Sequence, residues 1–136
     1  MPESLGKFVP RPTVETEPYW QGCRNHELLI QQCLNCHNIQ FYPRIMCTQC
    51  TSREVGWIKA TGQGEVLSYT IVHRAISKAY QSEAPYVVAL IKLEEGPTMM
   101  SNIIGCDLNA IEIGMKVQVV FEDWSASMTI PQFKTI

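Results

Sequence analysis

Two Cys-x-x-Cys pairs, Cys33-Leu-Asn-Cys36 and Cys47-Thr-Gln-Cys50, stand ten residues apart in the first half of the chain. Each pair presents two thiols from one chain reversal, and two facing reversals bring four sulfur atoms to a common centre. Four thiolates around one point are the ligand set of a closed tetrahedral metal site, and a double pair is far more specific than a single one. The sequence therefore predicts a metal centre at Cys33, Cys36, Cys47 and Cys50.

Zn(II) is the favoured ion, because it accepts four sulfurs at about 2.3 Å without a geometric preference and brings no redox chemistry. Iron in a rubredoxin-like cage uses the same four ligands, so an electron-transfer site is an open alternative. Cys33 to His37 also spells the attachment pattern of a c-type haem, and either pair alone could be a thioredoxin-like redox motif. Both of these alternatives leave one cysteine pair without a role.

The composition bounds the class of protein. A chain of 136 residues with 46% hydrophobic and 18% charged residues is one globular domain or a small domain with an appendage. The N-terminus has no charged region followed by an apolar run, and no apolar stretch is long enough to cross a bilayer. We therefore expect a soluble, cytoplasmic protein with no membrane partner. In that reducing compartment, Cys23 and Cys106 should be unpaired, buried thiols.

Residues 1–27 are predicted as a proline-rich arm followed by a short helix. The helix should begin after Thr16, with the acid and the proline of Glu17-Pro18 in its first turn. Its apolar face should pack on the following segment, with a subunit contact as the alternative. Residues 28–53 are predicted as the zinc ribbon, because strand-like runs at 28–32 and 39–42 lead toward the cysteine pairs.

Residues 54–136 are predicted as an OB-fold domain. The strand-like runs in it lie at 55–60, 65–73, 86–93, 98–104, 116–122 and 128–133. Gly62 and Gly64 are expected to hold backbone angles that other residues resist. One helical turn is expected at 107–114, between the third and fourth barrel strands. The predicted fold class is mainly β: a short N-terminal helical segment, a rubredoxin-like zinc ribbon, and a five- to six-stranded OB-fold barrel.

This order of elements resembles a family of small proteins that join a rubredoxin-like zinc ribbon to an OB-fold and associate with thiolase-superfamily enzymes. The resemblance covers nearly the whole chain, from about Pro12 to Phe133, and departs from the family where His26, His37 and Thr51 stand in place of glycine. The residues that carry it are Tyr19-Trp20, Leu28 to Cys33, Cys36, Phe41, Pro43-Arg44, Cys47, Cys50, Trp57, Gly62, Gly64, Val66, Ser68 to Thr70, Pro85 to Ala89, Leu93 to Gly96, Ile113-Gly114, Val117, Val120 to Asp123, Pro131 and Phe133.

The resemblance implies a non-catalytic accessory subunit of a thiolase, aldolase or synthase. Such an enzyme makes or breaks carbon-carbon bonds in acyl-CoA substrates, including those of aromatic-acid or steroid degradation. It also implies structural Zn(II), a CoA thioester shared with the partner, and a heterotetramer with two copies of each subunit. Arg74, immediately before the long loop 75–85, and Lys78, within that loop, are the candidate CoA-proximal residues. Tyr19, Trp20 and residues around Arg44 are the expected interface, because aromatic residues and arginine are enriched at binding hot spots.

Two other functions compete with this interpretation. A nucleophilic enzyme would need Cys106 beside a base such as His73, and nothing in the pattern places the two together, so no catalytic residue is assigned. The alternative binding function is a single-stranded nucleic-acid module, for which zinc ribbons and OB-folds are both used. The net charge of −2 and the scattered lysines provide no positive groove for a phosphate backbone, which argues against nucleic acid as the partner.

Overall fold

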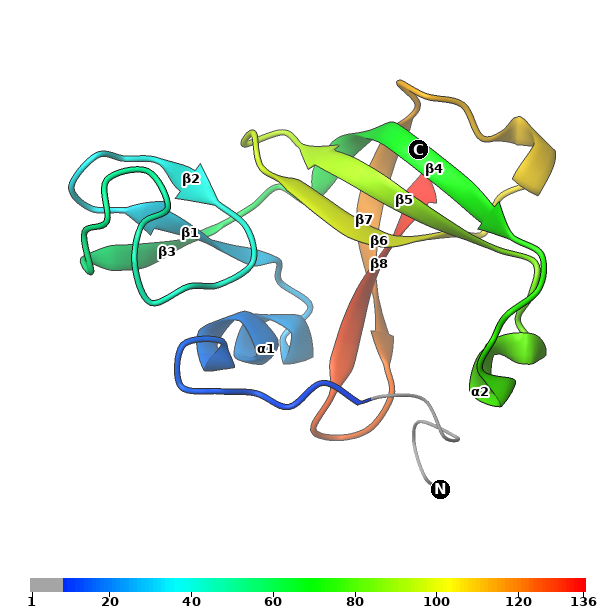
Figure 1. The fold of residues 1–136 in the computed structure, drawn as a ribbon, viewed down its shortest axis with the longest axis horizontal. Helices are drawn as coiled ribbons and strands as arrows, with labels where there is room; N and C mark the ends of the chain where they lie inside the picture. Colours follow the sequence, from blue (N-terminus) through cyan, green and yellow to red (C-terminus); the bar gives the residue numbers. More distant parts are fainter. Residues whose placement is uncertain (1–8) are drawn as a thin grey trace.

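The computed structural model describes residues 9–136 and arranges them as a helix, a small sheet and a closed barrel (Figure 1). Helix α1 is Glu17–Arg24, and the small sheet contains β1 (Leu29–Cys33), β2 (Ile39–Gln40) and β3 (Val55–Lys59). The barrel contains β4 (Gln63–Val72), β5 (Tyr86–Leu93), β6 (Thr98–Ile104), β7 (Lys116–Asp123) and β8 (Thr129–Thr135). Most of the predicted arm lies outside the described residues.

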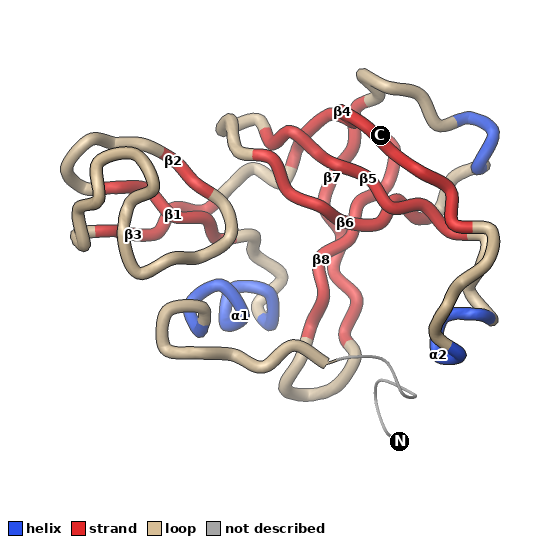
Figure 2. The backbone as a smooth tube through the Cα atoms, viewed as in Figure 1, coloured by secondary structure: helices blue, strands red, loops and turns tan. Residues whose placement is uncertain are grey.

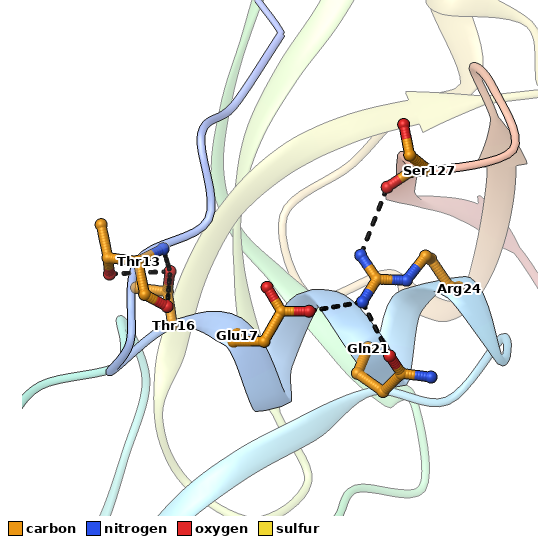
Figure 3. A network of polar contacts seen from close by, with 6 residues as sticks. All are labelled: Thr13, Thr16, Glu17, Gln21, Arg24 and Ser127. Carbon is orange, nitrogen blue, oxygen red and sulfur yellow. Dashed lines mark hydrogen bonds and ion pairs between the residues drawn. The ribbon is translucent and has the colours of Figure 1, made fainter.

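The side chains at the two ends of helix α1, Thr16 and Arg24, make hydrogen bonds that the sequence analysis did not predict. Thr16 is the N-cap position, but its hydroxyl accepts a hydrogen bond from the Thr13 amide at 2.8 Å and makes no cap to the helix. At the other end, the Arg24 guanidinium binds Glu17 and Gln21 on the same helix and donates to the Ser127 carbonyl oxygen at 3.2 Å (Figure 3). Arg24 therefore ties the helix to the turn between β7 and β8.

The small sheet has the order β2-β1-β3, and β3 belongs to it rather than to the barrel. Residues 55–60 were expected to form a barrel strand, and that assignment is wrong. Strand β3 pairs antiparallel with β1 along its whole length, from Leu29 opposite Lys59 to Cys33 opposite Val55. A strand's own periodicity shows which face is buried but not which strand lies beside it. Strand β3 therefore supports Cys33, the first cysteine of the first pair, on the side of β1 opposite β2.

The barrel has the order β4-β5-β6-β8-β7 and closes where β4 pairs with β7, as the tube in Figure 2 shows. Alternation builds its core: on β5 the side chains of Val87, Ala89, Ile91 and Leu93 are buried, and the residues between them are not. The helical turn predicted at 107–114 is present as the short 3-10 helix Leu108–Ala110, capped by Asp107. It lies between the third and fourth barrel strands. The predicted OB-fold barrel is confirmed with five strands.

Gly62, in the connection that leads into β4, is predicted to tolerate no side chain. It has a φ of +83°, and a Cβ there would lie 2.4 Å from Val119 Cγ1. We expect Gly62→Ala to lower the free energy of unfolding by clearly more than the ~1 kcal/mol of an ordinary glycine replacement, because backbone strain and a clash add. Denaturant unfolding measures the difference.

The matched control is Gly105→Ala, at a φ of +71°, where an added Cβ would meet no heavy atom within 4 Å. It carries the backbone strain without the clash, so equal losses in both variants would show that Val119 simply moves aside.

Gly64 was expected to need a special backbone angle, and this expectation is wrong. Its φ is not positive; a Cβ there would instead approach the Lys92 carbonyl oxygen at 2.7 Å.

Candidate metal centre

Two turns of the same geometry present the four cysteines. In the first, the Cys36 amide donates to the Cys33 sulfur at 3.4 Å; in the second, the Cys50 amide donates to the Cys47 sulfur at 3.5 Å. Each turn ends at a residue with left-handed backbone, His37 at a φ of +67° in the first and Thr51 at +65° in the second. These positions were predicted as sites where glycine is commoner, and the structure confirms that conformation.

The four sulfur atoms lie within 4.8 Å of one another, with 3.5 Å between Cys33 and Cys50 and 3.6 Å between Cys36 and Cys47. In a regular tetrahedron with metal–sulfur bonds of about 2.3 Å, the sulfurs are about 3.8 Å apart. The cage therefore has the size that a four-thiolate metal ion requires. Since the protein supplies four ligands, no coordination position is left for a substrate, and the geometry is that of a structural site.

The surroundings of this cage shift the pKa values of two of its thiols in opposite directions. The backbone amide of Ser52 and the side-chain amide of Asn35 lower the pKa of Cys50 to about 6. The Asn38 amide also acts to lower the pKa of Cys36, but desolvation and the neighbouring thiols outweigh it and raise that pKa to about 12. A divalent ion at the centre removes this conflict, because it stabilises every thiolate at once. The shifted thiol pKa values and the size of the cage therefore both fit a divalent metal ion.

Two buried glutamines support the cage, and sequence reasoning missed them. Gln31 on β1 donates to the Arg44 carbonyl oxygen at 2.9 Å and accepts from the Arg44 amide at 2.8 Å. Gln40 on β2 donates to Gln31 at 2.8 Å and accepts from the Thr48 amide at 2.9 Å. These bonds fix the loop that carries Cys47 against the sheet. No local pattern signalled this role, because polar residues in strands are usually assigned to the solvent side.

The candidate CoA-proximal residues lie far from the metal centre. Arg74 follows β4 and Lys78 begins the short helix α2 (Lys78–Gln81), and both side chains are exposed. Figure 1 shows α2 and the ribbon at opposite ends of the molecule. Within residues 9–136, neither cation forms an ion pair. The structure therefore leaves both available to an anionic group without bringing them to the cage.

The expected interface residues are only partly at the surface. Tyr19 is 5% exposed and packs edge-on against Phe41, with ring centroids 5.6 Å apart. It belongs mainly to the core, so little of its surface is available to a partner. Trp20 is half-buried and Arg44 is exposed, so these two remain accessible to a partner.

The remaining two cysteines, Cys23 and Cys106, lie outside the four-cysteine cage. Cys23 is fully buried, as the sequence analysis predicted. Burial raises the pKa of its thiol to about 11. Cys106 was also expected to be buried and is only partly so, and burial raises the pKa of its thiol as well. The described part of the chain contains no hydrogen bond between Cys106 and His73, so the structure does not assemble the nucleophile and base considered above.

No helix among residues 9–136 is long and apolar enough to cross a membrane.

A helix, a four-cysteine ribbon and a closed OB barrel in one chain define a class of protein, the zinc-ribbon and OB-fold proteins. Residues 20–56 match the family described as the rubredoxin-like zinc ribbon domain of ChsH2, and residues 57–122 match its C-terminal OB-fold domain. The chain is 36% identical over 109 residues to a DUF35 domain-containing scaffold protein of Methanothermobacter thermautotrophicus, covering 79% of this chain and 81% of that protein. The chain belongs to this ChsH2/DUF35 family.

Two further comparisons add detail. A probable enoyl-CoA hydratase alpha subunit of Thermomonospora curvata is 33% identical over 127 residues; the match covers 92% of this chain but only 39% of that subunit. The chain thus spans well under half of the length of that relative. A solved structure described as the Ltp2-ChsH2(DUF35) aldolase superposes with a TM-score of 0.84 at 31% identity, over 93% of this chain and 98% of the compared one.

Proposed function

We propose that this chain is a non-catalytic accessory subunit of a thiolase-superfamily enzyme, a thiolase, aldolase or synthase, that acts on acyl-CoA substrates. The observation that carries the proposal is the likeness, over 93% of the chain, to a chain of an aldolase structure whose name pairs Ltp2 with ChsH2. A scaffold role also agrees with the site. The cage has four protein ligands and no open position, and burial raises the pKa of both remaining cysteine thiols, which disfavours the nucleophilic thiolate.

The finer parts of the proposal follow from the same role. The bound ion is structural Zn(II), because a closed thiolate cage in a scaffold needs stability and no redox change. The partner holds the reacting groups and is present in two copies, beside two copies of this chain, in the cytoplasm. A CoA thioester is shared between the two subunits, with Arg74 or Lys78 facing its phosphates. Substrates of steroid or aromatic-acid degradation belong to this class.

The test is to express this chain alone, the thiolase-like or aldolase-like subunit encoded beside it alone, and both together. We expect full acyl-CoA turnover only from the pair, with a complex mass equal to two copies of each. Carbon-carbon cleavage, condensation and hydration should all be assayed, because the hydratase relative leaves the reaction open. Full turnover by the partner alone, or turnover by this chain alone that vanishes in Cys106→Ser, would overturn the proposal. Salt-sensitive retention on single-stranded DNA would favour the nucleic-acid module instead.

A further inference from the structure

A groove with a volume of about 620 Å³ lies where α1, the ribbon loop and the barrel meet. Trp20 and Tyr42 contribute to its wall from the N-terminal part of the chain, and Met100 and Ile130 contribute from the barrel. Among the described residues that line it, Glu83 is the only one with a charged side chain. Exposed apolar side chains, including Tyr42 at 49% and Met100 at 57%, lie on this groove. Its occupant should therefore be largely uncharged and apolar.

The groove runs along a part of β6 that has a strand partner on one side only. Strands β6 and β8 pair in parallel at Ile103–Phe133 and Ile104–Lys134. Further toward the start of both strands the ladder reaches Pro131, which has no N–H to donate. The Pro131 carbonyl oxygen accepts a hydrogen bond from the Ser101 hydroxyl at 3.0 Å instead. Residues 98–101 of β6 are therefore paired with β5 alone.

The direction of the backbone groups on this part of β6 follows from its pairing with β5. The Leu93 amide donates to the Pro97 carbonyl oxygen at 2.8 Å, so residues 97, 99 and 101 direct their groups toward β5. Residues 98, 100 and 102 alternate with them and direct their groups away from β5. In agreement, the Met100 amide donates to the Tyr42 hydroxyl at 3.4 Å, a long contact at the edge of hydrogen-bonding range. The Met100 amide thus lies at an open strand edge inside an apolar groove.

We propose that this groove docks an extended peptide segment of the partner enzyme, which adds to the barrel as a strand beside β6. An open strand edge recognises a peptide backbone, and apolar walls on either side receive the alternate side chains of an extended chain. The segment should be uncharged, with aliphatic or aromatic residues at every second position. Residues 98–101 offer a length of about 13 Å to it. The inference rests on the proposed function, because it assigns the surface through which that partner binds.

The test uses the full chain and the partner subunit defined above, with the dissociation constant measured by calorimetry. Met100→Pro removes the amide hydrogen that faces the groove and leaves the ladder with β5 intact, because that amide is not part of it. We expect Met100→Pro to raise the dissociation constant about tenfold or more, since a backbone hydrogen bond is lost and the ring obstructs a neighbouring strand. The matched control Met100→Ala keeps the amide hydrogen and should weaken binding much less.

A second pair of variants keeps the result interpretable if Met100→Pro does not fold. Met100→Glu places a charge in the groove from a side chain that is already 57% exposed, so the fold should tolerate it and binding should weaken. Tyr42→Phe removes the internal acceptor of the Met100 amide and should leave binding unchanged or tighter.

Each contrary outcome has a distinct meaning. Wild-type affinity in Met100→Pro and Met100→Glu overturns the groove as the docking site and leaves the scaffold role intact. A dimer of this chain alone that Met100→Pro dissociates shows that a second copy fills the groove, which also overturns the inference. A wild-type chain that binds no such partner overturns both proposals.

Discussion

Replacing Cys47 with serine is expected to release the metal ion and to unfold the ribbon. The Cys47 residue is 1% exposed, and its sulfur lies 3.6 Å from the Cys36 sulfur and accepts hydrogen bonds from the Gln49 and Cys50 amides. Serine leaves three thiolates around an ion that takes four. Because structural zinc binding supplies folding free energy of roughly 10–16 kcal/mol in small zinc domains, even a partial loss is large. Elemental analysis of freshly purified protein should find about one zinc per wild-type chain and a small fraction of it in the variant.

The control for this experiment is Cys106→Ser, which removes a thiol that is not part of the cage. It should retain the full zinc content and an unchanged circular dichroism spectrum. Iron in the wild-type protein would support the rubredoxin-like alternative, and a full zinc complement in Cys47→Ser would show that the fourth ligand is dispensable. Either result would contradict the structural zinc centre.

The barrel strands and the cysteine cage were predictable because their signals are local. Strand β5 shows its alternation in four successive inward residues, and the cysteine spacing alone defines the ligand set. The partner of β3 was not predictable, because strand pairing depends on register against β1, twenty or more residues earlier in the chain. The burial of Tyr19 was missed for a related reason. An aromatic residue on a helix face packs in a core or binds a partner according to what folds over it.

The supporting glutamines and the groove were also beyond local reasoning. Gln31 and Gln40 are polar residues in strands, and periodicity assigns such residues to the solvent side. Their role appears only when the loop around Arg44 folds back on them. The open edge of β6 depends on Pro131, some thirty residues later, and the Tyr42 hydroxyl, some sixty residues earlier, contacts that edge. Proline in a strand does predict an interrupted ladder, but not the strand whose edge it leaves open.

Replacing Phe133 with alanine is expected to destabilise the barrel more than any other single truncation in its core. The Phe133 side chain is 0% exposed, and the residue joins two strands, pairing with Ile103 on β6 and with Val119 on β7. Truncation removes its apolar contacts and leaves a cavity at the point where β8 closes the barrel. Such substitutions cost about 3–5 kcal/mol, a large part of the ~5–15 kcal/mol that stabilises a typical domain. Denaturant unfolding followed by near-ultraviolet circular dichroism measures the loss.

The zinc content of the Phe133→Ala protein then shows how far the two parts of the chain depend on each other. The cage is built from β1, two loops and the glutamine pair, and none of its ligands lies on the barrel. We therefore expect zinc to remain bound at full stoichiometry while the barrel melts at lower denaturant. Lys134→Ala, at the exposed neighbour of Phe133, should change neither quantity. Loss of zinc together with the barrel would instead show that the two are coupled into one unfolding unit, through the buried core that Tyr19 and Ile30 share with Phe133 and through the Arg24–Ser127 hydrogen bond.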